Sequence, residues 1–174
     1  MSPQNSQDEI SLIVGIGASA GGLDAFSELL SHLPTDTGMG FVLVQHLAPE
    51  QESLLRELLA RTTQMPVKTA ENGMRVEANH VYVVPPNAKM TIAEGRLQLA
   101  VCDQSHRSIK TIDLFFESLA TDQKNKAIAI VLSGSNNDGA IGVKAIHAEG
   151  GIVFAQERTT AECDVLPPLT AWAV

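Results

Sequence analysis

Three side chains that could act together in nucleophilic catalysis occur at separate points of the chain. Ser19 lies in Gly-Ala-Ser-Ala-Gly (17–21), His46 follows an apolar run, and Asp138 lies in Ser-Asn-Asn-Asp-Gly (135–139). A serine hydroxyl becomes an effective nucleophile when a base, usually histidine, removes its proton, and a carboxylate commonly fixes the tautomer of that histidine. The glycines beside Ser19 also match the G-x-S-x-G pattern of a nucleophile turn. These three residues are therefore the candidates for a catalytic triad.

The same glycine-rich segment fits a second kind of site, one that binds a dinucleotide. Residues 15–20 match the pattern G-x-G-x-x-A, which holds a pyrophosphate in dinucleotide-binding folds. Such a site needs an acidic side chain at the end of the following strand. That strand ends in Gln45 instead, and Asp36 lies before the strand. The sequence therefore favours a nucleophile turn over a cofactor loop, and we expect no cofactor.

Composition limits the class of protein further. The 174 residues include 44% hydrophobic and 18% charged residues, which suits one globular domain. The net charge is −8, and no cluster of Lys and Arg indicates a nucleic-acid partner. The apolar runs are shorter than the roughly 20 residues of a membrane helix, and residues 1–10 lack signal-peptide features, so we expect a cytoplasmic protein without membrane insertion. Cys102 and Cys163 lack metal-site spacing, and no metal is expected.

The elements that must position the triad follow residues 1–10, which we expect to be disordered. Strands are predicted at 11–16, 38–44, 127–132 and 152–155, and helices at 21–33, 51–63, 111–120 and 139–149. The segment 67–99 is predicted to be a strand insert with a hairpin at Glu94-Gly95. This order predicts an α/β fold, a doubly wound, mostly parallel sheet with helices on both faces and a short strand or hairpin insert.

This fold would bring the three candidates together, because the carboxyl ends of parallel strands share one edge of a sheet. Each also has a structural alternative: a capping serine in a turn, a strand-end histidine bonded to backbone, and a turn or N-cap aspartate at 138. Their convergence on three strand ends favours catalysis. The backbone N–H of Ala20 is then the expected oxyanion donor, with a second donor from 134–137.

Other side chains of reactive or flexible type are expected to have structural roles. The four remaining histidines lack comparable partners and are predicted to be structural or solvated, and four methionines are predicted to pack in the interior. They are His32, His80, His106, His147, Met39, Met65, Met74 and Met90. In the helix 139–149, the apolar spacing predicts that Ile141, Ala145 and Ile146 face the core.

Several segments form an ordered set along the chain: VGIGASAGGLDA, FVLVQHLAPE, LLARTTQMPV, AENGMRVEANHVYVVPPN, IDLFFESLA, IVLSGSNNDGAIGVKAI and EGGIVFAQE. From about residue 12 to 156, and more loosely to 173, the set closely resembles the catalytic domain of CheB-type protein-glutamate methylesterases, the chemotaxis enzymes. The resemblance implies hydrolysis of glutamate γ-methyl esters on the cytoplasmic helices of methylated chemoreceptors, with release of methanol, and in some members deamidation of glutamine. The family's triad falls on Ser19, His46 and Asp138.

The chain departs from this resemblance at its ends and in one loop. In the family a receiver domain usually precedes the esterase domain, but few residues precede the first strand here. In this respect the chain resembles members whose esterase is the first domain of a fusion with methyltransferase or kinase modules. Residues 11–174 are expected to form one catalytic domain whose C-terminal end is truncated at Val174. Gly134-Ser135-Asn136 replaces the usual G-M-G. That change motivates an alternative, a catalytically silent binding module in a fusion signalling protein, and a third is an esterase or deamidase for another substrate.

Overall fold

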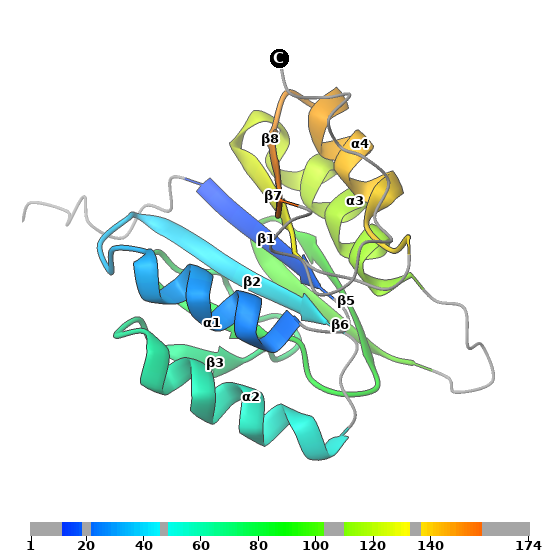
Figure 1. Ribbon diagram of the computed structural model, residues 1–174. Coiled ribbons are helices and arrows are strands. Elements are labelled where there is room, and N and C mark those ends of the chain that lie inside the picture. The colour runs from blue at the N-terminus through cyan, green and yellow to red at the C-terminus, as the bar shows by residue number, and fades with distance from the viewer. Residues whose placement is uncertain (1–11, 19–21, 46–48, 103–109, 133–136, 158–174) are drawn as a thin grey trace, which may run out of the picture.

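A six-stranded parallel sheet forms the centre of the protein in a computed structural model (Figure 1). The structure describes residues 12–18, 22–45, 49–102, 110–132 and 137–157. The segment predicted to be disordered, 1–10, and the chain end at 158–174 lie outside the described residues. Helices cover both faces of the sheet (Figure 1). The predicted doubly wound α/β architecture is therefore confirmed.

The strand order places the first strand of the chain in the middle of the sheet. From edge to edge the order is β3 (Val67–Thr69), β4 (Val81–Val83), β2 (Met39–Gln45), β1 (Leu12–Ala18), β7 (Ala127–Val131) and β8 (Ile152–Ala155). Every neighbouring pair is parallel. Strands enclosed on both faces read as continuous apolar runs, which is why β1, β2 and β7 are recognisable in the sequence.

Alternate side chains of the central strand point into two separate hydrophobic cores. On one face Val14 and Ile16 pack with the helices α1 (Gly22–His32) and α2 (Pro49–Thr62). On the other face Ile13 packs with α3 (Thr111–Gln123) and α4 (Ala140–Ala148). A short 3-10 turn, η1 (Lys124–Lys126), leads from α3 into β7. Met65 and Met90 are buried in these cores, as predicted for packing residues.

The predicted insert divides into two parts. The hairpin at Glu94-Gly95 is confirmed, since β5 (Ala88–Ala93) and β6 (Arg96–Val101) form an antiparallel pair around this turn. The prediction that the rest of the segment is also an insert is wrong, because β3 and β4 join the main sheet beside β2. Each has three residues, too few to show a period. The burial of β4, whose residues are at most 1% exposed, comes from its neighbours on both sides.

The inward face of α4 differs from the prediction. Ile146 is buried as expected, but Ile141 is half exposed, and Gly142 and Val143 face the core instead. The reason is the close packing of α4 on α3. A Cβ atom added at Gly142 would overlap the Cβ of Phe116 on α3, so the helix turns its glycine rather than its isoleucine toward the neighbour.

This contact makes Gly142→Ala a destabilising substitution even though alanine has the higher helix propensity. The added methyl meets the rigid start of the Phe116 side chain, so backbone must move, and such overpacking costs about 1–3 kcal/mol. We expect urea denaturation to show a loss of free energy of unfolding in this range. Lys144→Ala, an exposed change on the same helix, should stay within about 0.5 kcal/mol. A Gly142→Ala protein of wild-type stability would contradict this packing.

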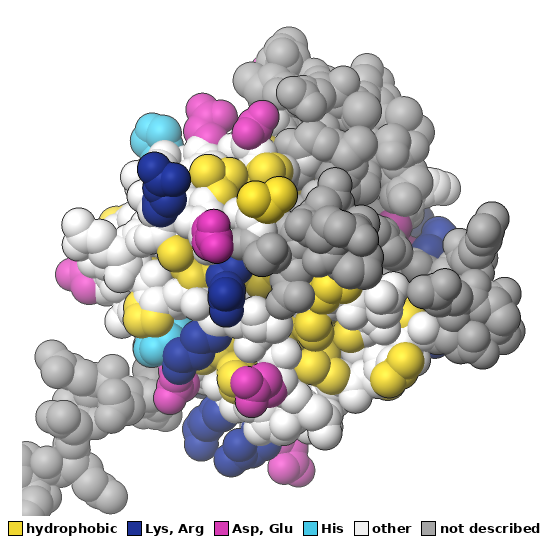
Figure 2. Space-filling model, turned by 90° about the horizontal axis from the view of Figure 1, so that it is seen from below, with side chains coloured by type: hydrophobic (Ala, Val, Ile, Leu, Met, Phe, Trp, Pro, Cys, Tyr) yellow, Lys and Arg dark blue, Asp and Glu magenta, His cyan; other side chains and the backbone are white. Residues whose placement is uncertain are grey.

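The described surface mixes charged and hydrophobic side chains. The face in Figure 2, seen from below, shows basic side chains lying among acidic ones, with hydrophobic side chains between them. Leu23 of α1 and Leu54 and Leu58 of α2 are among the exposed hydrophobic residues. None of the helices in the described segments is long and apolar enough to cross a membrane.

Candidate active site

The carboxyl ends of neighbouring strands lead to the predicted triad. β1 lies between β2 and β7, and Ala18 at the end of β1 is opposite Gln45 at the end of β2. Ser19 and His46 directly follow these two residues in the sequence and themselves lie outside the described residues. Asp138 is described and lies in a turn between β7 and α4. All three positions thus follow adjacent, parallel strands.

The chain reverses its direction of winding at the same strand ends. From β1 it proceeds to β2 and then to β3 and β4 on one side, and it returns to β7 and β8 on the other side. In doubly wound sheets the ligand site lies at the carboxyl edge where the strand order reverses. That point lies between β1 and β7, so the residues following these two strands are the best placed to meet a substrate.

Asp138 is buried, with 4% of its surface exposed, and holds the start of α3. Its Oδ2 accepts a hydrogen bond from the backbone N–H of Ile112 at 3.0 Å, and its Oδ1 accepts one from that of Asp113 at 2.9 Å. The positive end of a helix dipole favours a carboxylate here. Asp138 therefore lies in a turn, as one structural alternative proposed, but it caps α3. The alternative that Asp138 is the N-cap residue of the following helix is wrong, since Gly139 is the N-cap residue of α4.

A second buried carboxylate lies beside it and was missed by the sequence analysis. Asp113, in the first turn of α3, is 3% exposed. Its Oδ1 accepts backbone hydrogen bonds from Gly139, Ile141 and Gly142 at 3.0, 2.8 and 2.8 Å. Lys110 places its Nζ 3.5 Å from Oδ2 of Asp113. The only signal in the sequence is an acid in a first helical turn, which is common in ordinary helices.

The glycines of the dinucleotide pattern have a packing role in the structure. A Cβ added at Gly17 would lie 2.5 Å from Cγ2 of Ile112, and one at Gly15 would lie 2.9 Å from Cε1 of Phe116. Both glycines therefore let α3 approach β1 closely. This helix-strand contact accounts for glycine at both positions.

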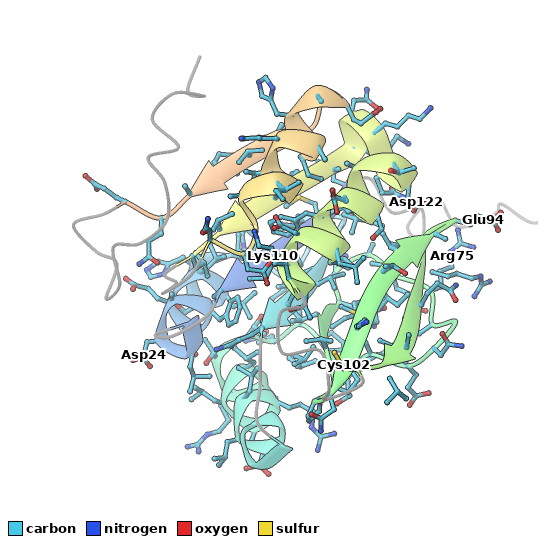
Figure 3. All side chains as sticks on the ribbon, turned by 90° about the vertical axis from the view of Figure 1, so that its right-hand side faces the viewer. Asp24, Arg75, Glu94, Cys102, Lys110 and Asp122 are labelled. Atoms are coloured by element: carbon cyan, nitrogen blue, oxygen red, sulfur yellow. The ribbon has the colours of Figure 1, made fainter. Side chains whose placement is uncertain are left out.

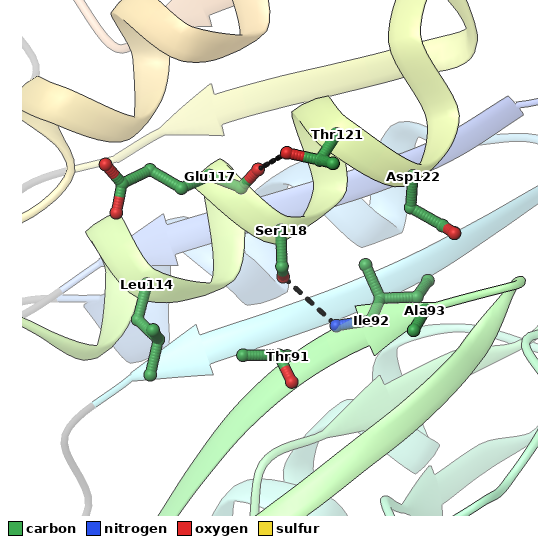
Figure 4. A pocket seen from close by; sticks show the side chains of 8 residues that line it. All are labelled: Thr91, Ile92, Ala93, Leu114, Glu117, Ser118, Thr121 and Asp122. Atoms are coloured by element: carbon green, nitrogen blue, oxygen red, sulfur yellow. Dashed lines mark hydrogen bonds between the residues drawn. The ribbon is translucent and has the colours of Figure 1, made fainter.

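The described residues also form a pocket that is separate from Asp138. Figure 4 shows this pocket, of about 440 Å³, between residues 114–122 of α3 and residues 91–93 at the end of β5. Ser118 accepts a hydrogen bond from the backbone N–H of Ile92 at 3.0 Å across its floor. Asp138, the described member of the predicted triad, does not line it.

A cluster of titratable side chains lies near the amino end of β4, opposite the carboxyl edge. Lys68 Nζ lies 2.8 Å and His80 Nε2 lies 3.6 Å from Oε2 of Glu77. The hydrogen bond from Lys68 lowers the pKa of Glu77 and raises the pKa of Lys68. Both side chains are exposed, so the pair is a solvated ion pair of small energetic effect. No group of His, Cys, Asp and Glu in the described segments could hold a metal ion.

The fold and the site together define the class: a doubly wound α/β domain whose candidate site lies at the carboxyl edge of its parallel sheet, beside a buried carboxylate. The chain belongs to the CheB methylesterase family, whose model matches residues 14–171. It is similar in structure to the crystal structure of the Thermotoga maritima CheB methylesterase catalytic domain. That match has a TM-score of 0.79 at 28% sequence identity and covers 90% of this chain and 85% of the other.

Two relatives show how this domain occurs in other proteins. A putative protein-glutamate methylesterase/protein-glutamine glutaminase of Leptospira interrogans is 33% identical over 87% of this chain and 79% of its own length. An uncharacterized 104.1 kDa protein of Rhodobacter capsulatus is 42% identical over 65% of this chain, which corresponds to 12% of that protein. The chain spans 42–49% of the length of further relatives named protein-glutamate methylesterase/protein-glutamine glutaminase.

Proposed function

We propose that this domain is a protein-glutamate methylesterase that hydrolyses γ-methyl esters. In this proposal Ser19 is the nucleophile, His46 is the base, and the Asp138 carboxylate orients the histidine. The observation that carries the proposal is the arrangement of β2, β1 and β7, adjacent parallel strands whose carboxyl ends lead to these three residues. The names of its relatives support the same activity.

The proposed reaction has two steps that return the enzyme to its starting state. Ser19 Oγ attacks the ester carbonyl while His46 takes its proton, and the ester C–O bond then breaks as His46 passes that proton to the departing methanol. Water attacks the acyl-enzyme in the same way, which releases glutamate and restores the Ser19 hydroxyl. The same chemistry applied to a glutamine side chain would release ammonia, which fits the glutaminase activity named for the relatives.

The Asp138 carboxylate is suited to its proposed role by its surroundings. Both of its oxygens accept backbone hydrogen bonds from α3, so its orientation is fixed before a substrate binds. A carboxylate oxygen can accept more than one hydrogen bond, which leaves capacity for the imidazole N–H. The proposed oxyanion donors are the backbone N–H of Ala20 and a second donor from residues 134–137. Of these residues, only Asn137 lies within the described part of the chain.

The proposed substrate is the methylated cytoplasmic helix of a chemoreceptor, in the cytoplasm. The esterase belongs to a larger signalling protein, with methyltransferase or kinase modules as the proposed neighbours. The Rhodobacter relative, in which the matching segment is a small part of the whole, supports such a fusion. The test is methanol release from a methylated receptor fragment. A domain that binds the fragment without releasing methanol would be the catalytically silent module instead.

The proposed mechanism predicts that activity rises with pH through the histidine range. Below the pKa of a histidine side chain, about 6.5 when unperturbed, His46 would carry a proton and could not accept one from Ser19. We therefore expect kcat/KM to increase about tenfold per pH unit on the acid side and to level off above the pKa. Initial rates from pH 5 to 8 check this, with spontaneous ester hydrolysis measured in parallel. A rate independent of pH over this range would count against a histidine base.

A further inference from the structure

Two helices at the candidate site, α3 and α4, have no side-chain cap from their own N-cap residues, and each is capped by a carboxylate from another part of the chain. Neither Lys110 before α3 nor Gly139 before α4 makes a side-chain capping hydrogen bond. Asp138, just before α4, accepts two N–H groups of α3, and Asp113, on α3, accepts three at the start of α4. The five hydrogen bonds form a closed reciprocal arrangement, which we term the capping pair Asp113/Asp138.

The capping pair fixes the backbone on the C-terminal side of Asp138. The N–H of Gly139 belongs to the peptide bond that directly follows Asp138, and it donates to Oδ1 of Asp113 at 3.0 Å. Ile141 and Gly142 donate to the same oxygen, so the first turn of α4 is held at the same point. Asp113 therefore holds the peptide group that directly follows Asp138.

From this geometry we infer that Asp113 is a positioning residue for the carboxylate of Asp138. The inference rests on the proposed function, in which Asp138 orients His46. Asp113 acts through the backbone of α4, and it has no contact with the substrate in this scheme. Displacement of a catalytic group by about 1 Å can cost about 100-fold in rate, so loss of the cap should reduce the rate of the chemical step more than the binding of substrate.

The two oxygens of Asp113 have different surroundings, which provides a conservative variant. Oδ1 accepts all three backbone hydrogen bonds, while buried Oδ2 has no hydrogen-bond partner among the described residues. In an Asp113→Asn protein, the asparagine side chain can keep its carbonyl oxygen in the place of Oδ1 and put its NH₂ group in the place of Oδ2. The ion pair with Lys110 is then lost, but the lysine is partly exposed and can turn to solvent. Asp113→Ala removes the acceptor, and Asp113→Glu keeps it but moves it by one methylene.

Asp122 offers a matched control on the same helix. Its Oδ1 and Oδ2 accept backbone hydrogen bonds from Glu94 and Gly95 at 2.5 and 3.0 Å, so it too is a carboxylate of α3 that holds a neighbouring turn. Figure 3 shows Asp122 beside Glu94, at the end of α3 far from Lys110. Asp122→Ala should therefore destabilise the fold without changing the site.

The experiment measures kcat and KM for methanol release from a methylated chemoreceptor fragment, per folded molecule as judged by circular dichroism. We expect Asp113→Ala and Asp113→Glu to lower kcat about 10- to 100-fold with KM within about threefold. Asp113→Asn and Asp122→Ala should stay within about threefold of wild type. In Asp113→Ala the acid limb of the kcat/KM profile should also move to lower pH, because a displaced carboxylate stabilises the histidinium less.

Several outcomes would overturn the inference. One is a folded Asp113→Ala or Asp113→Glu protein with the wild-type kcat and pH profile, and if the alanine variant does not fold, the glutamate variant decides. Another is an Asp113→Asn protein as slow as Asp113→Ala, since it retains the acceptor. Failure of the proposed function is distinguishable: Ser19→Ala would then keep the wild-type rate, whereas failure of the positioning role alone leaves Ser19→Ala inactive and Asp113→Ala active.

Discussion

Replacement of Ser19 by alanine is expected to lower kcat for methanol release by about 10⁴- to 10⁶-fold, the range seen when one residue of a serine triad is removed. Alanine cannot form the acyl-enzyme, so only the polarisation of the ester by the rest of the site remains. Binding of the methylated receptor fragment should persist, because the substitution removes one small hydroxyl group. The measurement is methanol release at saturating substrate, together with the Kd of the fragment.

Ser27 provides the control for this substitution. It lies on α1, soon after Ser19 in the sequence, and its buried hydroxyl has no hydrogen-bond partner among the described residues. Ser27→Ala should therefore keep the wild-type rate. A serine-directed fluorophosphonate should label the wild-type and Ser27→Ala proteins but leave Ser19→Ala unlabelled. Wild-type protein that binds the receptor fragment yet neither reacts with the reagent nor releases methanol would show a silent binding module instead.

The strands and turns that the sequence predicts correctly are those whose own residues show a recognisable pattern. β1 and β2 are buried on both faces, so their continuous apolar runs identify them, and the Glu94-Gly95 turn identifies its hairpin. In contrast, β3 and β4 are strands because β2 supplies a hydrogen-bonding neighbour. Three-residue segments contain no periodicity of their own, and the sequence assigns them to an insert.

The candidate site shows the same division between local and long-range information. Asp138 can be found because it follows a recognisable strand in a loop of turn residues. Asp113 could not be found, because its partners lie 26–29 residues further along the chain. Capping patterns in a sequence relate a residue to the next three or four positions, whereas here each cap comes from a residue 25 or more positions away. The inward turn of Gly142 in place of Ile141 has the same origin, the contact with α3.

Asp138→Asn should separate the chemical role of this residue from its structural one. Asparagine is nearly isosteric but has one acceptor oxygen, so its NH₂ group must face the backbone N–H of Ile112 or Asp113. In serine triads the aspartate-to-asparagine change leaves the wrong histidine tautomer and lowers kcat about 10⁴-fold. We expect a loss of that size here. The measurement is kcat per folded molecule, and Asp36→Ala, an exposed change in the turn before β2, is the control.

Asp138→Ala should add a larger loss of stability, because the start of α3 then loses both hydrogen bonds and two N–H groups stay buried without an acceptor. Unsatisfied buried donors cost about 1–3 kcal/mol each, so the free energy of unfolding in urea should fall by about 2–6 kcal/mol. A purely structural aspartate would show this loss, but its folded fraction would keep the wild-type kcat. A triad aspartate shows the loss of rate in both variants at a temperature where both are folded. The kcat of the folded protein therefore tests the chemical role of Asp138, and the free energy of unfolding tests its role as the cap of α3.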